Sequence, residues 1–409
     1  MRILLWHGYL LGGTGSNVYT RSIAREWSRS GHEVVVVSQE GNPELHDLGG
    51  AQTVRPDIGN VLPVFVLDRY EGYDVRLIQD LAQEERDRIV EANAAALREL
   101  APADLVFANH VLLGAPVGAA SGLPFAVKAH GSELEYSMRG NDELARWGRE
   151  TLAKAGAVFV GSAHIREVLE DVVGHVDRVY EVPPGVDVDE FRLKPRDEAL
   201  AQLLEEARLD RPNPGNGNER LPDAENAKRL EAFLGGAGRP TVLYFGKLLR
   251  NKGVHLLLEA LRRVDARAVI VGFGDYREAL EAMAGPDVLF TGPLEHRHLV
   301  HLIPLADVTV VPSIFPEAFG MVAAEAAAGG SLPLVARHSG LAEIADALEE
   351  ANVPASFESG DVDDLVEKLD ALLGLSPDGR RKLSQRARRV AEERWSWSSV
   401  AHRLLEPFE

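Results

Sequence analysis

Short apolar runs alternate with amphipathic segments along most of this 409-residue chain. The run "RILLW" at residues 2–6 leads into a glycine-rich stretch, after which Val18, Ile23 and Trp27 recur at helical spacing. The next run, "VVVV" at residues 34–37, is β-branched throughout, as in strands that are buried on both faces. Because parallel strands need long crossover connections, this alternation predicts parallel sheets with helices on both faces.

The alternation is interrupted once and then restarts, which predicts two doubly wound domains. Residues 194–238 are charged, contain Pro and Gly clusters, and carry no strand-like run. Ligands of open α/β sheets bind at the carboxyl ends of the strands, so two Rossmann-like domains facing each other would share one cleft. We expect an N-terminal domain at 1–193, a charged inserted linker with one or two solvated helices at 194–238, a C-terminal domain at 239–376, and a helical segment at 377–409 that could cross back to the N-terminal domain.

Charge and composition exclude several classes of partner and cofactor. The net charge of −19 disfavours nucleic acid, because phosphate backbones are held by clustered Lys and Arg. With no cysteine, the chain has no disulfide and no thiolate metal site. No apolar run approaches about 18 residues, and the first residues resemble a strand and not a signal peptide. We therefore expect a cytoplasmic protein.

Within "FPEAFGMVAAEAAAGG" at residues 315–330, a loop is expected to be followed by a helix. The backbone N–H groups of Phe319, Gly320 and Met321 would be unpaired donors in the first helical turn, with about half a positive charge behind them. Such a helix start is a seat for an anion, most naturally a phosphate group.

Two glutamates flank this seat eight positions apart. Glu317 lies outside it and could accept hydrogen bonds from sugar hydroxyls. Glu325 lies about 7 Å further along the helix than Gly320, where it could bind a ribose diol. The alternative is a loop acid and a helix-surface acid with no ligand. The glycine at the helix start and the small residues around it favour the site.

A second loop repeats this arrangement after the strand that ends at Gly246. Lys247 and Lys252 follow that strand and precede a helix. Two ammonium groups beside an anion seat could neutralise a leaving diphosphate without a metal ion. The alternative is that one of them is a solvated surface lysine.

In the first domain, the glycine-rich stretch at residues 12–17 follows the first strand. It fails as a dinucleotide fingerprint, because Val18 stands where the third glycine belongs. It would still let a phosphate or a sugar approach the backbone. His130 ends a later strand, where it could donate a hydrogen bond to a substrate or be a structural histidine. His110, at the end of another strand, is a weaker candidate.

Several other motifs carry less chemistry. The Asp-Val-Asp triplets at 187–189 and 361–363 resemble a metal-binding pair, but the first follows a turn and the second is placed to cap a helix. The histidines in "EHRHLVHL" at 295–302 lack the spacing of a zinc helix and indicate a solvated helical face. We expect no metal site. The basic run at 380–389 could touch an anionic membrane surface, but a solvated helix is favoured.

The stretch "EAFGMVAAE" resembles the Glu-x7-Glu motif of glycosyltransferase family 4, whose members are retaining enzymes with the GT-B fold. "GGTGSN", "AHGSE", "VPPGVDVDEF" and "GKLLRNKG" are similar to other landmarks of that family in the same order. Two departures are Lys247, where the family usually has arginine, and Ser339-Gly340, where it usually has two glycines. An arginine can bind a phosphate group through two parallel hydrogen bonds, whereas the ammonium group of Lys247 acts as a point charge.

The resemblance implies a role for each matching position. Catalytic roles fall to His130, Lys247, Lys252 and Glu317. Donor binding falls to Gly13, Gly246, Lys247, Lys252, Glu317, Phe319, Gly320, Met321, Val322 and Glu325. Within this set, the amides of 319–322 would meet the diphosphate and the sugar, and Glu325 would hold the ribose. Asn17 and His110 would lie on the acceptor side.

The implied activity is transfer of a hexose from a nucleoside-diphosphate sugar, with a UDP-sugar such as UDP-glucose favoured and GDP-mannose second. The acceptor would be a small molecule, a glycan or a lipid, and no cofactor beyond the nucleotide sugar is needed. The variable loops at residues 40–80, including "VFVLDRYEGYD", would select the acceptor. Three alternatives stay open: a nucleotide-sugar epimerase or phosphorylase of the same fold, a dinucleotide-dependent oxidoreductase, and a non-catalytic nucleotide-sugar sensor.

Overall fold

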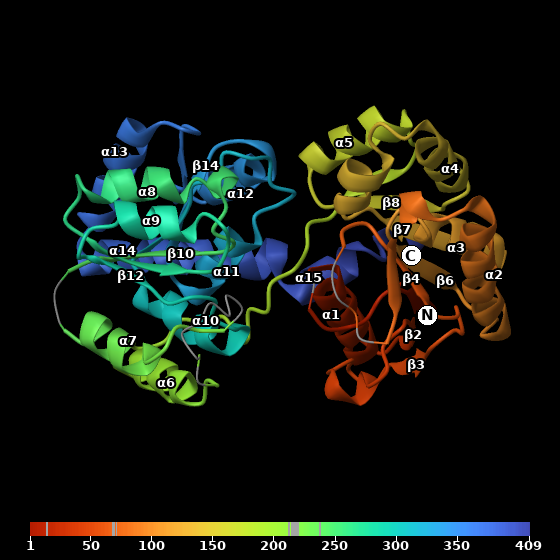
Figure 1. The fold of residues 1–409 in the computed structure, drawn as a ribbon, viewed down its shortest axis with the longest axis horizontal. Helices are drawn as coiled ribbons and strands as arrows, with labels where there is room; N and C mark the ends of the chain where they lie inside the picture. Colours follow the sequence, from red (N-terminus) through yellow and green to blue (C-terminus); the bar gives the residue numbers. More distant parts are fainter. Residues whose placement is uncertain (14, 68–69, 71, 212, 214–220, 237–238) are drawn as a thin grey trace. The chain divides into compact units, whose positions relative to one another are not determined.

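The computed structural model describes residues 1–13, 15–67, 70, 72–211, 213, 221–236 and 239–409. These residues form two compact units (Figure 1). Unit 1 comprises Met1–Gly185 and Trp397–Glu409, and unit 2 comprises Val186–Ser396. Each unit is built on its own parallel sheet, which confirms the predicted α/β class with two doubly wound domains.

The described strands of unit 1 form a seven-stranded sheet in which β1 (Arg2–Trp6) lies between β2 (Glu33–Val37) and β6 (Leu105–Asn109). Both pairings are parallel, with Leu4 opposite Val35 and Val106. The remaining strands of this sheet are β3 (Gln52–Val54) on the β2 side, and β7 (Phe125–Lys128), β8 (Ala157–Val160) and β9 (Val179–Glu181) on the β6 side, while β4 (Val61–Val64) and β5 (Asp74–Leu77) form a separate parallel pair.

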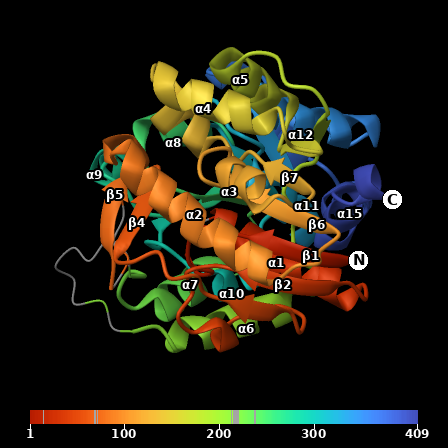
Figure 2. The same cartoon turned by 90° about the vertical axis from the view of Figure 1, so that its right-hand side faces the viewer.

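The sheet of unit 1 separates two apolar cores because successive side chains of a strand point to opposite faces. Leu4 and Trp6 of β1 pack into one core, and Ile3 and Leu5 into the other. One face is covered by α2 (Gln83–Glu99), α3 (Gly114–Ser121), α4 (Asp142–Leu152) and α5 (Ala163–Val173), and the other by α1 (Gly15–Arg29) and α15 (Trp397–Arg403). Figure 2 turns this unit toward the viewer and labels the same helices.

The described strands of unit 2 form a six-stranded sheet in which β10 (Thr241–Phe245) lies between β11 (Arg267–Val271) and β13 (Val308–Val311). The outer strands are β12 (Val288–Phe290), β14 (Leu332–Ala336) and β15 (Ser356–Phe357). The helices are α6 (Arg196–Arg208), α7 (Asn226–Leu234), α8 (Val254–Leu261), α9 (Arg277–Met283), α10 (His296–Leu302), α11 (Met321–Gly329), α12 (Ser339–Glu350), α13 (Val362–Leu373) and α14 (Pro377–Val390). In Figure 1, α8, α9 and α13 lie on one face of this sheet, and α6, α7 and α10 on the other.

The segment 194–238, which the sequence suggested to be a charged linker with solvated helices, packs into unit 2 along one face. Leu203 of α6 and Leu230 of α7 are fully buried in the core of that unit. Most charged residues of both helices are exposed, although Arg196 and Arg229 donate to backbone carbonyls of unit 2, and the high overall charge hid this amphipathic pattern. Residues 212, 214–220 and 237–238 of this segment lie outside the described residues.

The chain passes between the units after Gly185 and again after Ser396, whereas the sequence suggested divisions after 193 and 376. The helix α14 stays with unit 2, where Arg388 donates to the carbonyl of Ala328 in α11 at 2.7 Å. The helix α15 packs on α1 of unit 1, where the indole N–H of Trp27 donates to Ala401 O at 2.9 Å. Among the described helices, none has the length and apolar character needed to cross a membrane.

Candidate functional site

The strand order of unit 2 reverses at β10, which has β11 on one side and β13 on the other. Ligands of open α/β sheets bind outside the carboxyl ends of the strands at such a point. Gly246 follows β10 directly, with Lys247 and Lys252 in the loop after it. The loop at 312–320 follows β13 and leads into α11. The structure thus brings the predicted donor-binding residues of unit 2 to one edge of the sheet.

Backbone hydrogen bonds fix the loop after β13 against the loop after β10. Ile314 N donates to Asn251 O at 3.0 Å, and Ser313 Oγ lies 3.4 Å from the same carbonyl and 3.1 Å from Phe315 O. From the other side, His338 Nε2 donates to Ser313 O at 2.6 Å. The loop that carries Glu317 is therefore held between two neighbouring connections of the sheet.

The Ser339-Gly340 pair, which replaces the two glycines usual in the family, also holds this loop. Glu317 N donates to Ser339 Oγ at 2.9 Å, and Gly340 N donates to Glu317 O at 3.0 Å. Ser339 has a φ of 47°, a left-handed backbone conformation that residues other than glycine seldom adopt. The serine hydroxyl supplies a contact to the Glu317 backbone that a glycine would lack.

The start of α11 is arranged as the sequence predicted. The helix begins at Met321, and its N-cap is Gly320, which has a φ of 116° that a β-carbon would strain. Among the residues that the structure describes, no side chain caps the start of this helix. Its first amide groups are therefore left for solvent or for an anion. Phe319 beside it is buried against Trp395, with the two ring centroids 6.0 Å apart.

Lys252 and Glu317 form an ion pair at the edge of this helix start. The distance from Lys252 Nζ to Glu317 Oε1 is 2.5 Å, and the two side chains are 27% and 22% exposed. Lys252 is therefore partly neutralised by an acid of the protein itself, a contact that the sequence did not reveal. Lys247 is exposed, and its carbonyl accepts a hydrogen bond from the Tyr244 hydroxyl at 2.8 Å.

Glu325 lies in the second turn of α11, as expected from its spacing. Burial raises the pKa of Glu325 to about 7, and the nearby His296 opposes this shift. His296 hydrogen-bonds to Glu190, and this contact raises the pKa of His296 above its ordinary value. A carboxyl group of this kind is partly protonated near neutral pH, so it can both donate to and accept from a diol.

In unit 1 the predicted residues gather at the carboxyl ends of β1, β6 and β7. Gly13 is exposed in the loop after β1, and Asn17 is buried in the first turn of α1. The Asn17 amide donates to Gly12 O, and its Oδ1 lies 2.8 Å from His7 Nε2. Thr14 of this loop lies outside the described residues.

His130 and His110 follow neighbouring strands and lie close together, with ring centroids 4.6 Å apart. His130 Nε2 lies 2.7 Å from Asn109 Oδ1. The buried carboxylate of Glu133 joins the two loops, since it accepts from His130 N at 3.0 Å and lies 3.3 Å from His110 Nδ1. His110 has a φ of 69° and is 3% exposed.

Burial keeps His7 and His130 of unit 1 uncharged near neutral pH. Burial lowers the pKa of His7 to about 3, with a further contribution from His110. Burial also lowers the pKa of His130 well below its ordinary value, and His110, Lys128 and His7 add to this effect. Burial also lowers the pKa of Lys128, to about 7.

Sequence reasoning missed three residues of this cluster: His7, Asn109 and Glu133. Their common signal is a polar residue within or just after an apolar strand, or in the turn that follows it. His7 directly follows the first apolar run and carries no motif of its own. Asn109 and Glu133 form hydrogen bonds with residues from other segments of the chain. The pattern of one sequence does not show which distant residues form such pairs.

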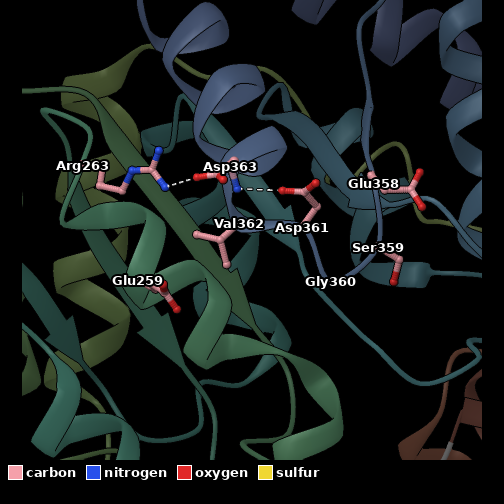
Figure 3. Close-up of a pocket in the computed structure, with 8 residues that line it drawn as sticks. All are labelled: Glu259, Arg263, Glu358, Ser359, Gly360, Asp361, Val362 and Asp363. Carbon is pink, nitrogen blue, oxygen red and sulfur yellow. Dashed lines mark hydrogen bonds and ion pairs between the residues drawn. The ribbon is translucent and has the colours of Figure 1, made fainter.

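The described residues contain no group of three or more His, Asp or Glu side chains that could hold a metal ion. The Asp-Val-Asp triplet at 361–363 caps α13, as predicted, because Asp361 accepts from the amides of Asp363 and Asp364. Figure 3 shows this triplet in a pocket where Arg263 pairs with Asp363 at 2.5 Å. Asp361 and Asp363 therefore have structural partners: Asp361 caps the helix α13, and Asp363 pairs with Arg263.

The prediction of a solvated histidine face on α10 is wrong for His298. Its side chain is fully buried, and Nε2 lies 3.1 Å from Asp210, which follows α6. The helix packs against α6, a contact that the sequence did not suggest because 194–238 was taken as a linker.

Two family models match the chain. The model described as "Glycosyltransferase Family 4" matches residues 13–190, and the model described as "Glycosyl transferases group 1" matches residues 231–390. The first match covers residues 13–185 of unit 1 and runs five residues into unit 2, and the second lies within unit 2.

Curated relatives include a D-inositol 3-phosphate glycosyltransferase from Xylanimonas cellulosilytica, 30% identical over 64% of this chain and 58% of that protein. A GDP-mannose-dependent α-(1-6)-phosphatidylinositol monomannoside mannosyltransferase from Mycobacterium tuberculosis is 28% identical over 81% of this chain and 78% of that protein. A sulfoquinovosyl transferase from Arabidopsis thaliana is 30% identical over 43% of this chain. The chain spans 58% and 34% of the Xylanimonas and Arabidopsis proteins.

Solved structures share the fold over almost the whole chain. Sucrose-phosphate synthase from Thermosynechococcus elongatus superposes with a TM-score of 0.69 at 20% identity, over 98% of this chain and 97% of that one. Anabaena HepE in complex with UDP and glucose superposes with a TM-score of 0.68 at 17% identity, over 99% of this chain and 98% of that one.

The chain has two parallel sheets and shares its fold with these solved structures. It therefore has the GT-B fold of nucleotide-sugar glycosyltransferases. The chain belongs to glycosyltransferase family 4.

Proposed function

We propose that this chain is a retaining, metal-independent glycosyltransferase that moves a hexose from a nucleoside-diphosphate sugar to an acceptor bound by unit 1. One observation carries the proposal: the uncapped start of α11 lies at the carboxyl edge of the sheet of unit 2, beside Lys252 and Glu317. A UDP-sugar is the first choice of donor and GDP-mannose the second. The Anabaena neighbour was solved with UDP and glucose, and the Mycobacterium relative is named for GDP-mannose.

Departure of the diphosphate is the step that this arrangement would accelerate. Negative charge grows on the leaving group as its bond to the sugar breaks, and donors that are already oriented stabilise that charge most. The amide groups of Gly320, Met321 and Val322 are held in place by the helix. Lys252 would turn from Glu317 toward the phosphates and leave that carboxylate free to accept hydrogen bonds from the donor sugar. Lys247 would add a second positive charge.

Glu325 would bind the ribose of the donor. Its raised pKa makes it a mixed donor and acceptor near neutral pH, which suits a diol that offers both kinds of group. On the other unit, His130, Asn17 and His110 would contact the reacting sugar and the acceptor.

The test compares Lys252→Ala with Lys228→Ala. Lys228 is a fair control because it also pairs with a glutamate, Glu225 at 2.8 Å, and it lies on α7 of the same unit. We expect Lys252→Ala to lower release of UDP from UDP-glucose, or of GDP from GDP-mannose, by about 100-fold or more while the melting temperature changes little. Lys228→Ala should behave as wild type.

Ligand binding is measured separately by thermal stabilisation with UDP and GDP, because a ligand that binds only the native state raises the melting temperature. The proposal fails if neither nucleotide stabilises the protein. It also fails if Lys252→Ala releases the nucleotide at the wild-type rate. The anomeric configuration of the product, read by proton NMR, decides whether transfer is retaining.

A further inference from the structure

Asn109, at the end of β6, is a buried amide whose orientation is fixed by its neighbours. Its Nδ2 lies 3.3 Å from Trp6 O and 3.2 Å from Thr20 Oγ1. The carbonyl can only accept, and the Thr20 hydroxyl already donates its proton to Ser16 O at 2.8 Å. Both neighbours therefore require a donor, so the NH2 group faces them and the amide oxygen faces away.

The amide oxygen of Asn109 faces His130 Nε2 at 2.7 Å. Because an amide oxygen only accepts, the proton of this hydrogen bond belongs to Nε2 of the imidazole. Burial keeps the pKa of His130 well below its ordinary value, so the ring is neutral and carries one proton. The second nitrogen, Nδ1, must then carry a lone pair.

The imidazole of His130 is also held in position. Its backbone N–H donates to Glu133 Oε1 at 3.0 Å, and the edge of its ring meets the Tyr19 ring at a centroid distance of 5.1 Å. His130 is partly exposed, and its Nδ1 has no hydrogen-bond partner among the side chains and backbone that the structure describes. This nitrogen is available to a ligand.

We propose that Asn109 is a positioning residue that fixes His130 in the Nε2–H tautomer, so that Nδ1 accepts a hydrogen bond from a hydroxyl group of the substrate. This role reverses the one suggested by the sequence, in which His130 donates. It rests on the proposed function for the identity of the substrate as a hydroxyl-bearing sugar or acceptor. A neutral ring with a lone pair at Nδ1 selects an alcohol O–H and does not select a phosphate oxygen.

Nitrogen NMR of the ¹⁵N-histidine-labelled protein without ligand tests the tautomer directly. We assign the signals of His130 by their loss in His130→Gln, a change at a partly exposed position. The expected result at pH 7.5 is a protonated, pyrrole-like Nε2 and an unprotonated, pyridine-like Nδ1. A proton on Nδ1, in a neutral or a charged ring, overturns the proposal.

Variants of Asn109 connect the tautomer to turnover. In Asn109→Ala the Nε2–H tautomer loses its partner, so we expect a mixture of tautomers and about a ten-fold loss of nucleotide release, the cost of one hydrogen bond. Asn109→Asp is no rescue variant, because its second oxygen would face Trp6 O and Thr20 Oγ1, which both require a donor. Wild-type turnover of Asn109→Ala, with its tautomer shifted, overturns the link to substrate.

Asn93 gives the matched control. It is also a buried asparagine of unit 1, and its amide accepts from Trp6 Nε1 at 3.0 Å and donates to Ile89 O at 2.8 Å without contact to a histidine. Asn93→Ala should leave the His130 tautomer and the rate unchanged. A loss in Asn93→Ala equal to that in Asn109→Ala would show a structural effect alone and overturn the proposal.

The proposed function and this inference fail by different results. If the wild-type protein cleaves neither UDP-glucose nor GDP-mannose, the proposed donors are wrong, while the nitrogen shifts of the free protein still decide the tautomer.

Discussion

Acids and bases of the candidate site differ in how their charge is balanced. Glu317 meets the ammonium group of Lys252 at 2.5 Å and is compensated within the protein. Glu325 has no such cation in direct contact among the described residues, and burial raises its pKa to about 7. Two glutamates eight positions apart on one segment therefore have different chemistry. One is an exchangeable ionic partner, and the other is a carboxyl group that titrates near neutral pH.

The raised pKa of Glu325 predicts a dependence of stability on pH. The folded state holds this proton up to about pH 7, whereas the unfolded chain releases it near pH 4.5. The contribution of Glu325 to stability therefore falls as the pH rises from about 4.5 through 7. Because glutamine does not titrate, Glu325→Gln should be more stable than wild type at pH 8 by about 1–3 kcal/mol, with no difference below about pH 4.5.

Thermal or urea unfolding at pH 4.5, 6 and 8 checks this prediction. Glu259→Gln, which changes an exposed glutamate on α8, is the control and should show little change at any pH. Equal stability of Glu325→Gln and wild type at pH 8 would contradict it.

At the scale of single residues, the sequence predicted the acids, the lysines and the glycine at the start of α11 because they lie in one contiguous motif or in one short loop. It did not predict Asn109, Glu133 or the role of Ser339. Each of these acts on a residue from another segment, as when Ser339 Oγ accepts from the Glu317 amide 22 positions away. Only the fold creates such contacts.

At the scale of elements, the start of α12 sets the position of the loop before α11. The backbone of Gly340 lies so close to this loop that a β-carbon would be 2.6 Å from Ala318 O and 2.7 Å from Phe319 Cα. Backbone atoms cannot yield as a flexible side chain does. The absence of a side chain at Gly340 therefore determines where Glu317 and the amides of α11 lie.

Gly340→Ala should displace the loop and weaken nucleotide binding. We expect at least a ten-fold rise in the Kd for UDP or GDP and a loss of about 1–3 kcal/mol in stability from overpacking. Isothermal titration and thermal unfolding measure the two effects. Gly285→Ala is the control, since a β-carbon there meets no atom within 4 Å. Unchanged nucleotide affinity in Gly340→Ala would refute this account of the loop.

Most elements could be predicted from local patterns. The buried strands of both sheets appear as apolar runs, and α11 ends at Gly329 and Gly330, a glycine pair typical of helix ends, with Gly330 at a φ of 92°. The helices α6 and α7 were predicted to be solvated, because their charge outweighed a narrow apolar stripe. The pair β4 and β5 lies within residues 40–80, a region without a recognisable sequence motif. Residues 68, 69 and 71 of this region lie outside the described part of the chain.

At the scale of the whole molecule, unit 1 is assembled from two separate pieces of sequence. Trp397 is 5% exposed and meets the Tyr19 ring at a centroid distance of 5.6 Å. Val400 and Leu404 of the same segment are fully buried against the sheet of unit 1. The core on this face of unit 1 is therefore incomplete without residues from beyond unit 2.

Trp397→Ala should destabilise unit 1 by about 3–5 kcal/mol through the cavity it leaves. Hydrogen–deuterium exchange read by mass spectrometry can locate the effect. We expect faster exchange in peptides of β1 and β6, and unchanged exchange in peptides of β10 and β13. His402→Ala, at an exposed position of α15, is the control. Equal exchange of β1 in Trp397→Ala and wild type would contradict the prediction.

The return of α15 to unit 1 imposes an order on biosynthesis. A ribosome delivers residues 186–396 before residues 397–405, so every segment of unit 2 has emerged while unit 1 still lacks Trp397 and the helix that follows. Domains usually mature from the N-terminus onward during translation. Here the unit that begins first is completed last, and a released chain that ends before residue 397 would carry all of unit 2 but a unit 1 with an open apolar face.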